Sequence, residues 1–136
     1  MAFVRRDHDG EVLVISMNRP RANALNQGLV QSLRQSFAIA KGEADIGAVV
    51  LTSGCPGFFS VGLDLKEIEG YDRETMRAFW LDFNALYRET HELPKPVIAA
   101  LPGHTVAGGI ILALACDMRF MAPGEYKLAV SGINMG

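Results

Sequence analysis

The sequence predicts an α/β domain whose sheet is mainly parallel. Three observations predict it: four short apolar segments, helical patterns that alternate with them, and glycine or proline at most of the junctions. A helix between two strands carries the chain back to the end of the sheet at which the first strand began, so this order favours parallel pairing. The length of 136 residues suits one domain with a single core.

The first strand is expected over residues 11–17, which are apolar and β-branched enough to be buried on both faces. A helix is then expected from about residue 26 to 41, followed by Gly42 as a C-cap. Its expected buried stripe consists of Leu29, Leu33, Phe37 and Ala40. The second strand covers residues 47–52, and a loop follows over residues 53–60.

The longest helical pattern covers residues 73–91, with Asp72 as its N-cap. We expect its buried stripe to contain Met76, Phe79, Phe83 and Leu86, and to be widened by Trp80 and Tyr87. A third strand is expected over residues 97–101 and a fourth over residues 118–121. Between these two strands, Gly108 and Gly109 open a helix that ends near residue 115.

Composition narrows the class of protein. Hydrophobic residues make up 49% and charged residues 21%, which indicates a folded domain, and the formal net charge of −2 is not clustered. No nucleic-acid footprint, polybasic membrane patch, secretory signal or membrane span is expected. Neither cysteine has metal-ligand spacing: Cys116 is interpreted as a buried core thiol and Cys55 as a turn residue, both reduced, which fits a cytoplasmic location.

Two glycine-containing segments are the candidates for chemistry. Residues 58–65 follow the second strand, and residues 103–109 follow the third strand and open a helix. Ligands of parallel α/β sheets collect beyond the carboxyl ends of strands, and glycine lets a backbone N–H approach a ligand closely. Two such N–H groups that point to one place would form an oxyanion hole. Structural glycines at strand-to-helix turns remain the alternative.

Several segments in order resemble the crotonase superfamily, the enoyl-CoA hydratase/isomerase family. Residues 12–25, with Asn18-Arg19-Pro20 and Asn23-Ala24-Leu25, are similar to its opening strand and adenine-side loop. Residues 49–67 resemble its first oxyanion segment, and their sequence motif is most similar to that of the mitochondrial-type Δ3,Δ2-enoyl-CoA isomerases. Residues 94–117 resemble the second oxyanion segment. The resemblance implies one partial crotonase-like domain over residues 1–136, a spiral of ββα units truncated before the C-terminal helical region.

The resemblance also implies site residues. The backbone N–H groups of Leu63 and Gly108 match the two oxyanion donors, which polarise a thioester carbonyl and stabilise its enolate. Residues 61–65 match the lining of the coenzyme A channel, and two alanines match positions near the adenine. The implied substrate-binding residues are therefore Ala22, Ala24, Val61, Gly62, Leu63, Asp64, Leu65 and Gly108. Asp64 is interpreted as a loop-capping carboxylate in preference to an acid or base.

The chain departs from the family at both glutamate positions, which fall on Ile111 and Gly132. Neither residue can move a proton, although hydration and isomerisation need a base near the substrate's α-carbon. His104 is the nearest titratable substitute in sequence, but a solvated or backbone-bonded histidine is the preferred interpretation, and Tyr126 is a weaker candidate. Some family members decarboxylate or hydrolyse thioesters with other polar groups.

These observations leave the following expectations. The chain binds an acyl-CoA, with coenzyme A as part of the substrate and no further cofactor or metal, in fatty acid metabolism. Isomerase or lyase activity is doubtful, and a homo-oligomer (a trimer or hexamer) is implied by the resemblance. The alternatives are a non-catalytic crotonase-fold assembly module and an inactive truncated fragment.

Overall fold

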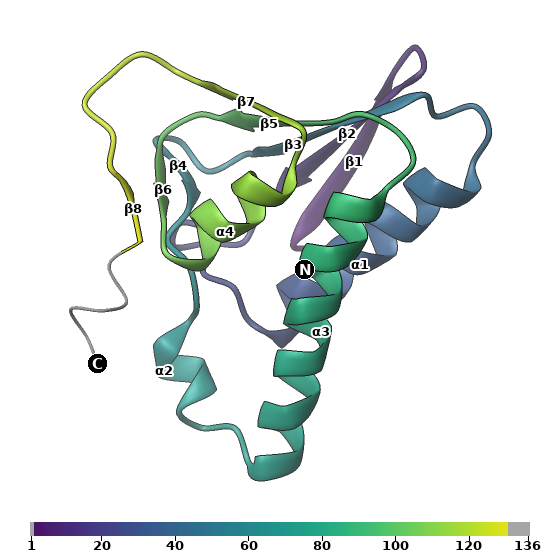
Figure 1. The fold of residues 1–136 in the computed structure, drawn as a ribbon. Helices are drawn as coiled ribbons and strands as arrows, with labels where there is room; N and C mark the ends of the chain where they lie inside the picture. The colour runs from purple at the N-terminus through teal and green to yellow at the C-terminus, as the bar shows by residue number, and fades with distance from the viewer. Residues whose placement is uncertain (1, 131–136) are drawn as a thin grey trace.

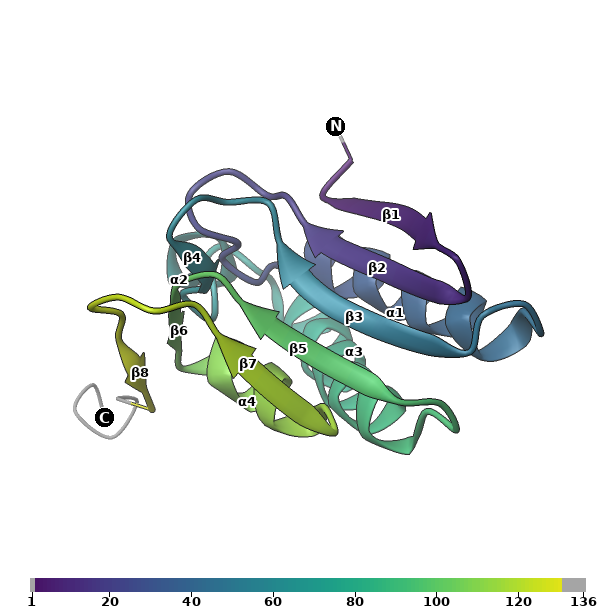
Figure 2. The ribbon, with the colours of Figure 1, turned by 90° about the horizontal axis from the view of Figure 1, so that it is seen from above.

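A five-stranded sheet forms the body of the protein. The computed structural model describes residues 2–130. The strands lie side by side in the order β1-β2-β3-β5-β7 (Figure 2), and every neighbouring pair is parallel except the antiparallel β1–β2 hairpin. Their bounds are β1 Val4–Asp9, β2 Val12–Met17, β3 Ala48–Ser53, β5 Val97–Leu101 and β7 Met118–Met121. The predicted parallel α/β class and its four strands are confirmed, whereas β1 was not predicted.

Helices cover one face of this sheet (Figures 1 and 2). They are α1 Gln27–Gly42, α3 Arg73–Glu92 and α4 Gly108–Ala115, while a single turn, α2 Leu65–Ile68, lies away from the sheet. The predicted stripe of α1 is confirmed as core, because Leu29, Leu33, Phe37 and Ala40 are all buried. Since α1 includes Gly42, the predicted glycine cap is wrong; the cap is Glu43, whose N–H donates to the carbonyl of Ile39.

Burial alternates along most of β2, β3 and β5. In β2, Leu13 and Ile15 are buried under the helices, whereas Val12 and Val14 are only half-buried. The expectation that this strand is buried on both faces is therefore wrong at its start. The physical reason is that the described helices pack on one face alone, and alternate side chains of a strand point to opposite faces.

A second, three-stranded sheet holds the glycine segments. It contains β4 Phe58–Ser60, β6 His104–Val106 and β8 Leu128–Ala129, paired in parallel in the order β4-β6-β8. The predicted loop over residues 53–60 therefore ends in a strand. Strands of two or three residues carry no period of their own, so that only their pairing defines them. The carboxyl ends of β4 and β6 lie next to each other as a result.

Helix α3 has one buried edge only. Asp72 caps it as predicted, because its side chain accepts a hydrogen bond of 2.7 Å from the N–H of Thr75. Phe79 and Leu86 are buried, but Trp80 and Tyr87 are 42% and 40% exposed, so the prediction that they pack in the core is wrong. The first turns of α3 extend beyond the body (Figure 1), and Trp80 packs edge-on against Phe79.

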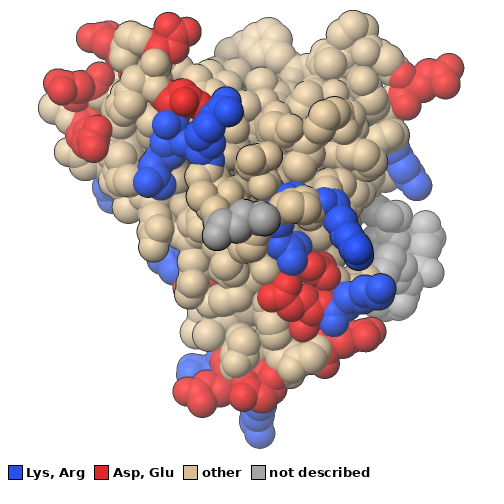
Figure 3. Space-filling view, turned by 180° about the vertical axis from the view of Figure 1, so that it is seen from behind, with Lys and Arg blue, Asp and Glu red and all other residues tan. Residues whose placement is uncertain are grey.

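The surface carries mixed charges. On the face opposite to that of Figure 1, lysine and arginine side chains lie among aspartate and glutamate side chains, with wide uncharged areas between them (Figure 3). No helix within residues 2–130 is long and apolar enough to cross a membrane.

Candidate active site

A left-handed turn begins the site. Arg21, Ala22 and Asn23 have φ angles of 64°, 65° and 54°, which residues with a side chain rarely adopt. The turn is closed on itself, because the Asn23 N–H donates to the Arg19 carbonyl (3.1 Å) and the Arg19 N–H donates to Asn23 Oδ1 (2.8 Å). Three consecutive strained residues persist only where surrounding contacts hold them.

Asn23 supplies those contacts and ties the turn to β4. Its side-chain amide is fully buried and donates to Ser53 Oγ (2.7 Å) and to the Phe59 carbonyl (2.9 Å). Its own carbonyl accepts a hydrogen bond of 2.8 Å from Ser60 Oγ, and the Ala22 carbonyl accepts one of 3.1 Å from the N–H of Val61. The turn and the first glycine segment therefore form one hydrogen-bonded unit.

A parallel bridge between Leu25 and Leu63 orients the first glycine segment. The Leu25 N–H donates to the Gly62 carbonyl (2.7 Å), and the Asp64 N–H donates to the Leu25 carbonyl (2.9 Å). The Leu63 N–H belongs to the same trans peptide as the Gly62 carbonyl, and the C=O and N–H of a trans peptide point in opposite directions. Because the Gly62 carbonyl points toward Leu25, the N–H of Leu63 points away from Leu25.

The two glycine segments touch. Gly62, with φ +89°, lies so close to the second segment that a Cβ placed on it would come within 3.0 Å of the Gly108 nitrogen. A Cβ on Gly108 would in turn lie 3.6 Å from the Gly62 Cα, and one on Gly109 would lie 2.6 Å from the Ser60 carbonyl oxygen. The distances at Gly62 and Gly109 require glycine, whereas 3.6 Å at Gly108 is ordinary van der Waals contact. Together they place the residue before Leu63 against the backbone of Gly108.

Strain recurs on the second segment. Ala107, which directly precedes α4, has φ 49° and ψ −122°, a conformation that strongly favours glycine. Gly108 begins the helix, so its N–H has no intrahelical acceptor. Within residues 2–130, neither the Leu63 N–H nor the Gly108 N–H donates a hydrogen bond to a protein atom. Two backbone donors are thus left available beside each other.

A groove of about 800 Å³ opens beside Leu63. This volume lies within the range of small-molecule sites. Four of the eight residues expected to bind substrate line this groove: Ala24, Leu63, Asp64 and Leu65. The side chains of Arg21 and Lys66 are exposed at its edge. Ala22 lines a separate hollow beside Cys55 and Phe58, and Gly62 and Gly108 are buried where the two segments touch.

Arg19 and two carboxylates form a charged cluster in the wall of the groove. The guanidinium donates to Asp64 Oδ2 (2.8 Å), to Glu67 Oε2 (3.0 Å) and to the Ala24 carbonyl (2.7 Å). Asp64 also caps α2 by accepting from the Glu67 N–H at 3.2 Å, so a capping carboxylate is what the structure contains. Partial burial works to raise the pKa of Asp64, but the hydrogen bonds from Arg19 and from the Glu67 backbone outweigh it and lower that pKa below its usual value.

An apolar pocket lies on the other side of Gly108. A Cβ on Gly108 would lie 3.2 Å from Leu25 Cδ1 and 3.6 Å from Phe83 Cζ, which identifies the neighbouring wall. Ile111, which the sequence resemblance assigns to a glutamate position of the family, lies one helical turn after Gly108. It lines this pocket together with Leu25, Phe83, Leu86, Tyr87 and Leu112. The cavity between them is only about 10 Å³, at the lower limit for one water molecule. The surroundings of Ile111 are therefore those of a packed hydrocarbon side chain.

The other residues considered from the sequence lie elsewhere. His104 is in β6, where its Nδ1 accepts a hydrogen bond of 3.0 Å from the Lys127 N–H and its ring packs edge-on against Tyr126. The preferred interpretation of a backbone-bonded histidine agrees with this contact, although His104 lies in a strand. Gly132 lies outside the described residues. Cys116 is buried, as predicted, and Cys55 is half-buried in the turn before β4.

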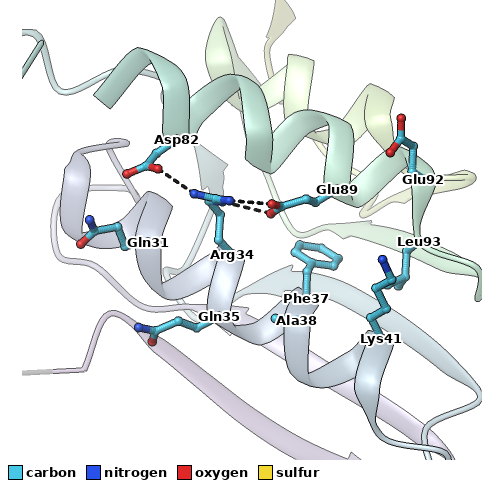
Figure 4. A pocket seen from close by; sticks show the side chains of 10 residues that line it. All are labelled: Gln31, Arg34, Gln35, Phe37, Ala38, Lys41, Asp82, Glu89, Glu92 and Leu93. Atoms are coloured by element: carbon cyan, nitrogen blue, oxygen red, sulfur yellow. Dashed lines mark hydrogen bonds and ion pairs between the residues drawn. The ribbon is translucent and has the colours of Figure 1, made fainter. Parts of the chain in front are cut away.

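A second large hollow, about 650 Å³, lies between α1 and α3 (Figure 4). Its central guanidinium, Arg34, is already bonded to Asp82 Oδ1 (2.6 Å) and to both carboxylate oxygens of Glu89. This hollow therefore offers mainly charges that neutralise one another, and no site residue predicted from the sequence lines it. Within residues 2–130, no three histidine, cysteine, aspartate or glutamate side chains gather as metal ligands.

Solved structures share this architecture. The chain superposes with a TM-score of 0.90 on an enoyl-CoA hydratase from Bacillus anthracis, at 32% identity, covering 99% of this chain and 53% of that one. A Geobacillus kaustophilus protein described as an enoyl-CoA hydratase superposes with a TM-score of 0.93 at 26% identity, over 100% of this chain and 52% of the other. The fold is thus the crotonase fold.

The family follows from the sequence comparisons. Residues 7–136 match the model of the enoyl-CoA hydratase/isomerase family, and the chain belongs to that family. It is 33% identical over 135 residues to mouse mitochondrial enoyl-CoA delta isomerase 1, covering 98% of this chain and 47% of the relative. It is 32% identical to the short-chain-enoyl-CoA hydratase of Clostridium acetobutylicum, covering 96% and 50%. The chain spans about half the length of the curated relatives it matches.

Sequence reasoning did not find the Arg19 cluster or the role of Asn23. Arg19 is separated from its acidic partners by 45 and 48 residues, so no local spacing indicates the contact. The only signal was that Asn18-Arg19-Pro20 and Asn23-Ala24-Leu25 resemble the family's opening loop. This resemblance indicated the region, but it did not indicate the contact of Arg19 with Asp64 and Glu67.

Proposed function

We propose that this chain binds an acyl-CoA thioester and polarises its carbonyl with the backbone N–H groups of Leu63 and Gly108. One observation carries the proposal: the two glycine segments touch at Gly62 and Gly108, beside two backbone donors that bond to no described protein atom. Family membership supports the acyl-CoA class, because the relatives are named as enoyl-CoA hydratases and isomerases.

The groove supports the placement of coenzyme A. It leads away from Leu63 past Ala24, and the exposed cations Arg21 and Lys66 stand at its edge. Phosphate groups are stabilised by such cations, whereas the nearby Arg19 is already committed to Asp64 and Glu67. The pantetheine arm then lies along residues 61–65, and the thioester meets the two amides.

The amides stabilise negative charge on the carbonyl oxygen. A preorganised donor in an oxyanion hole contributes about 2.7–4 kcal/mol to a transition state. Both donors belong to the backbone of tightly packed turns, so they need little reorganisation when the charge develops. Partial positive charge at the start of α4 acts in the same direction.

The proton-transfer step lacks its usual group among the described residues that line the apolar pocket, since Ile111 stands where the family has a glutamate. A general base contributes about 10²–10⁴-fold to such reactions. The proposed chemistry of this chain is therefore carbonyl polarisation, with slow hydratase or isomerase turnover.

Removal of one donor tests the proposal. Gly108→Pro removes the N–H, and Gly108→Ala keeps it while adding a methyl group next to the flexible end of Leu25. Binding of butyryl-CoA is measured by isothermal titration calorimetry, and thermal unfolding is measured on both variants. We expect Gly108→Ala to retain saturable binding and Gly108→Pro to lose at least tenfold in affinity. Equal affinity of a folded Gly108→Pro variant refutes the oxyanion assignment.

A second candidate function is an assembly module. Apolar side chains are exposed on β7, on β8 and at the end of α4: Leu114, Met118, Phe120, Leu128 and Val130. Exposed apolar area of this kind marks an interaction surface. Light scattering after size exclusion tests it: Phe120→Lys should lower the average mass if this surface joins copies of the chain, and a monodisperse wild-type monomer excludes such self-assembly.

A further inference from the structure

We propose that Arg19 is a positioning residue that holds the Leu63 N–H in its working orientation. This inference rests on the proposed function, and it concerns a side chain that contacts neither amide donor itself. Arg19 lies two residues after the end of β2. Of its two acidic partners, Asp64 directly follows Leu63 as the N-cap of α2, and Glu67 lies within α2.

The contacts of Arg19 surround the Leu63 peptide on two sides. One Nη1 donates both to the Ala24 carbonyl, which precedes Leu25, and to Asp64, which follows Leu63. The backbone bridge between Leu25 and Leu63 already joins these two segments, and the Arg19 side chain joins them a second time. The Leu63 N–H belongs to the Gly62–Leu63 peptide, and rotation of that peptide must break the hydrogen bond from the Leu25 N–H to the Gly62 carbonyl. Rotation of the next peptide, Leu63–Asp64, must break the bond from the Asp64 N–H to the Leu25 carbonyl, and the guanidinium holds the Asp64 side chain beside it.

Burial makes this cluster stronger than an ordinary surface ion pair. The side chains of Arg19 and Asp64 are only 16% and 20% exposed, and Phe3 lies under the guanidinium at 5.5 Å from ring centre to Cζ. Exposed pairs contribute little to stability because water and salt screen them, but partly buried charge-assisted hydrogen bonds are screened less. The planar fork of arginine also fixes direction, which a lysine cannot do.

The strained turn indicates why such a clamp is needed. Arg21, Ala22 and Asn23, which follow Arg19 after Pro20, adopt left-handed conformations that are unfavourable for residues with a Cβ. The Arg19 N–H and carbonyl close this turn through Asn23, while its side chain reaches Asp64 and Glu67. Arg19 therefore links the strained turn to Asp64, the residue that follows the donor Leu63.

The test measures carbonyl polarisation directly. Butyryl-CoA labelled with ¹³C at the carbonyl is bound to the full chain, and isotope-edited infrared difference spectroscopy records the carbonyl band. Wild-type protein should shift this band to lower wavenumber than in free butyryl-CoA. Arg19→Met should lose more than half of that shift while still reaching saturation, because the thioester binds but meets a disordered donor.

Arg34→Met is the matched control. Arg34 also bridges two carboxylates, Asp82 and Glu89, but it lies between α1 and α3 (Figure 4). We expect it to lower thermal stability while the carbonyl shift stays at the wild-type value. If Arg34→Met and Arg19→Met lose the shift equally, Arg19 acts only through general stability and the inference is wrong.

Two milder variants keep the inference testable if Arg19→Met does not fold. Arg19→Lys retains the charge but not the fork, and Asp64→Asn retains the capping ability of the side chain but not its charge. Both should reduce the carbonyl shift, and an unchanged shift in both overturns the inference. A wild-type chain that binds butyryl-CoA without shifting the band instead refutes the oxyanion proposal, and with it the role of Arg19.

Discussion

Replacement of Gly62 by alanine measures how closely the two glycine segments are packed. Gly62 has φ +89°, and a Cβ on it would lie 2.8 Å from Ala107 Cβ and 3.0 Å from the Gly108 nitrogen. Neither neighbour is the flexible end of a long side chain, so the backbone itself must move.

Two separate penalties follow from this geometry. A left-handed conformation is unfavourable by about 1–2 kcal/mol for a residue with a Cβ. Forcing an extra methyl group into a packed interior destabilises by about 1–3 kcal/mol. Gly62→Ala should therefore lower the free energy of unfolding by about 2–5 kcal/mol, a large fraction of what a domain of this size has.

Gly57→Ala is the control that separates the two penalties. Gly57 has φ +76°, but a Cβ on it would meet no atom within 4 Å. This variant should show the conformational penalty alone, about 1–2 kcal/mol. Urea unfolding followed by circular dichroism gives both free energies, provided that the slopes against urea agree. Equal destabilisation by the two variants would contradict the close approach of Gly62 to Gly108.

Three further outcomes are expected. The pKa of Asp64 is lowered in the folded chain, so its ionised form adds stability above about pH 4, and this stability is lost as the pH falls. Asp64→Asn should therefore flatten the decline of the urea midpoint between about pH 5 and pH 3. An unchanged decline contradicts this expectation. Burial raises the pKa of Cys116 to about 12, so its thiol is protonated and unreactive at pH 8. An aromatic disulfide reagent at pH 8 should therefore react only with Cys55 in the native chain and with both thiols in denaturant. Fast reaction of both thiols in the native chain refutes this expectation. Ile111→Glu should introduce a base that exchanges the α-protons of butyryl-CoA in heavy water, which NMR detects, whereas Ile111→Gln should not. If the glutamate variant binds butyryl-CoA without exchange, Ile111 does not lie beside the α-carbon.

Most of the larger elements could be predicted because their information is local. The third and fourth strands and the start of α4 lie at the predicted residues, and α1 and α3 agree to within a residue or two. In each case the apolar period matches the period of the element, so a short stretch of chain is sufficient. The exposure of Trp80 and Tyr87 could not be found this way, because a helical period shows which residues share a face but not what packs against that face.

The candidate site was also predicted only where its information is local. The two glycine segments were visible in the sequence, since glycine at the end of a strand is itself a signal. Their contact was not, because it depends on the parallel pairing of β4 with β6, strands of three residues each. The left-handed turn at Asn23 also has no sequence period, and its conformation is held by partners 30 to 37 residues away.

The sequence alone therefore determined the α/β class and the crotonase-type resemblance, and it led to the hypothesis that Ile111 occupies a family glutamate position. The tertiary structure decided that Gly62 lies against Gly108, and that Arg19 joins Asp64 and Glu67 beside the donor-bearing peptide. The reason is physical. Strands and helices follow from side-chain patterns along a few turns of chain, whereas a close backbone approach or a buried ion cluster exists only when distant segments are folded together.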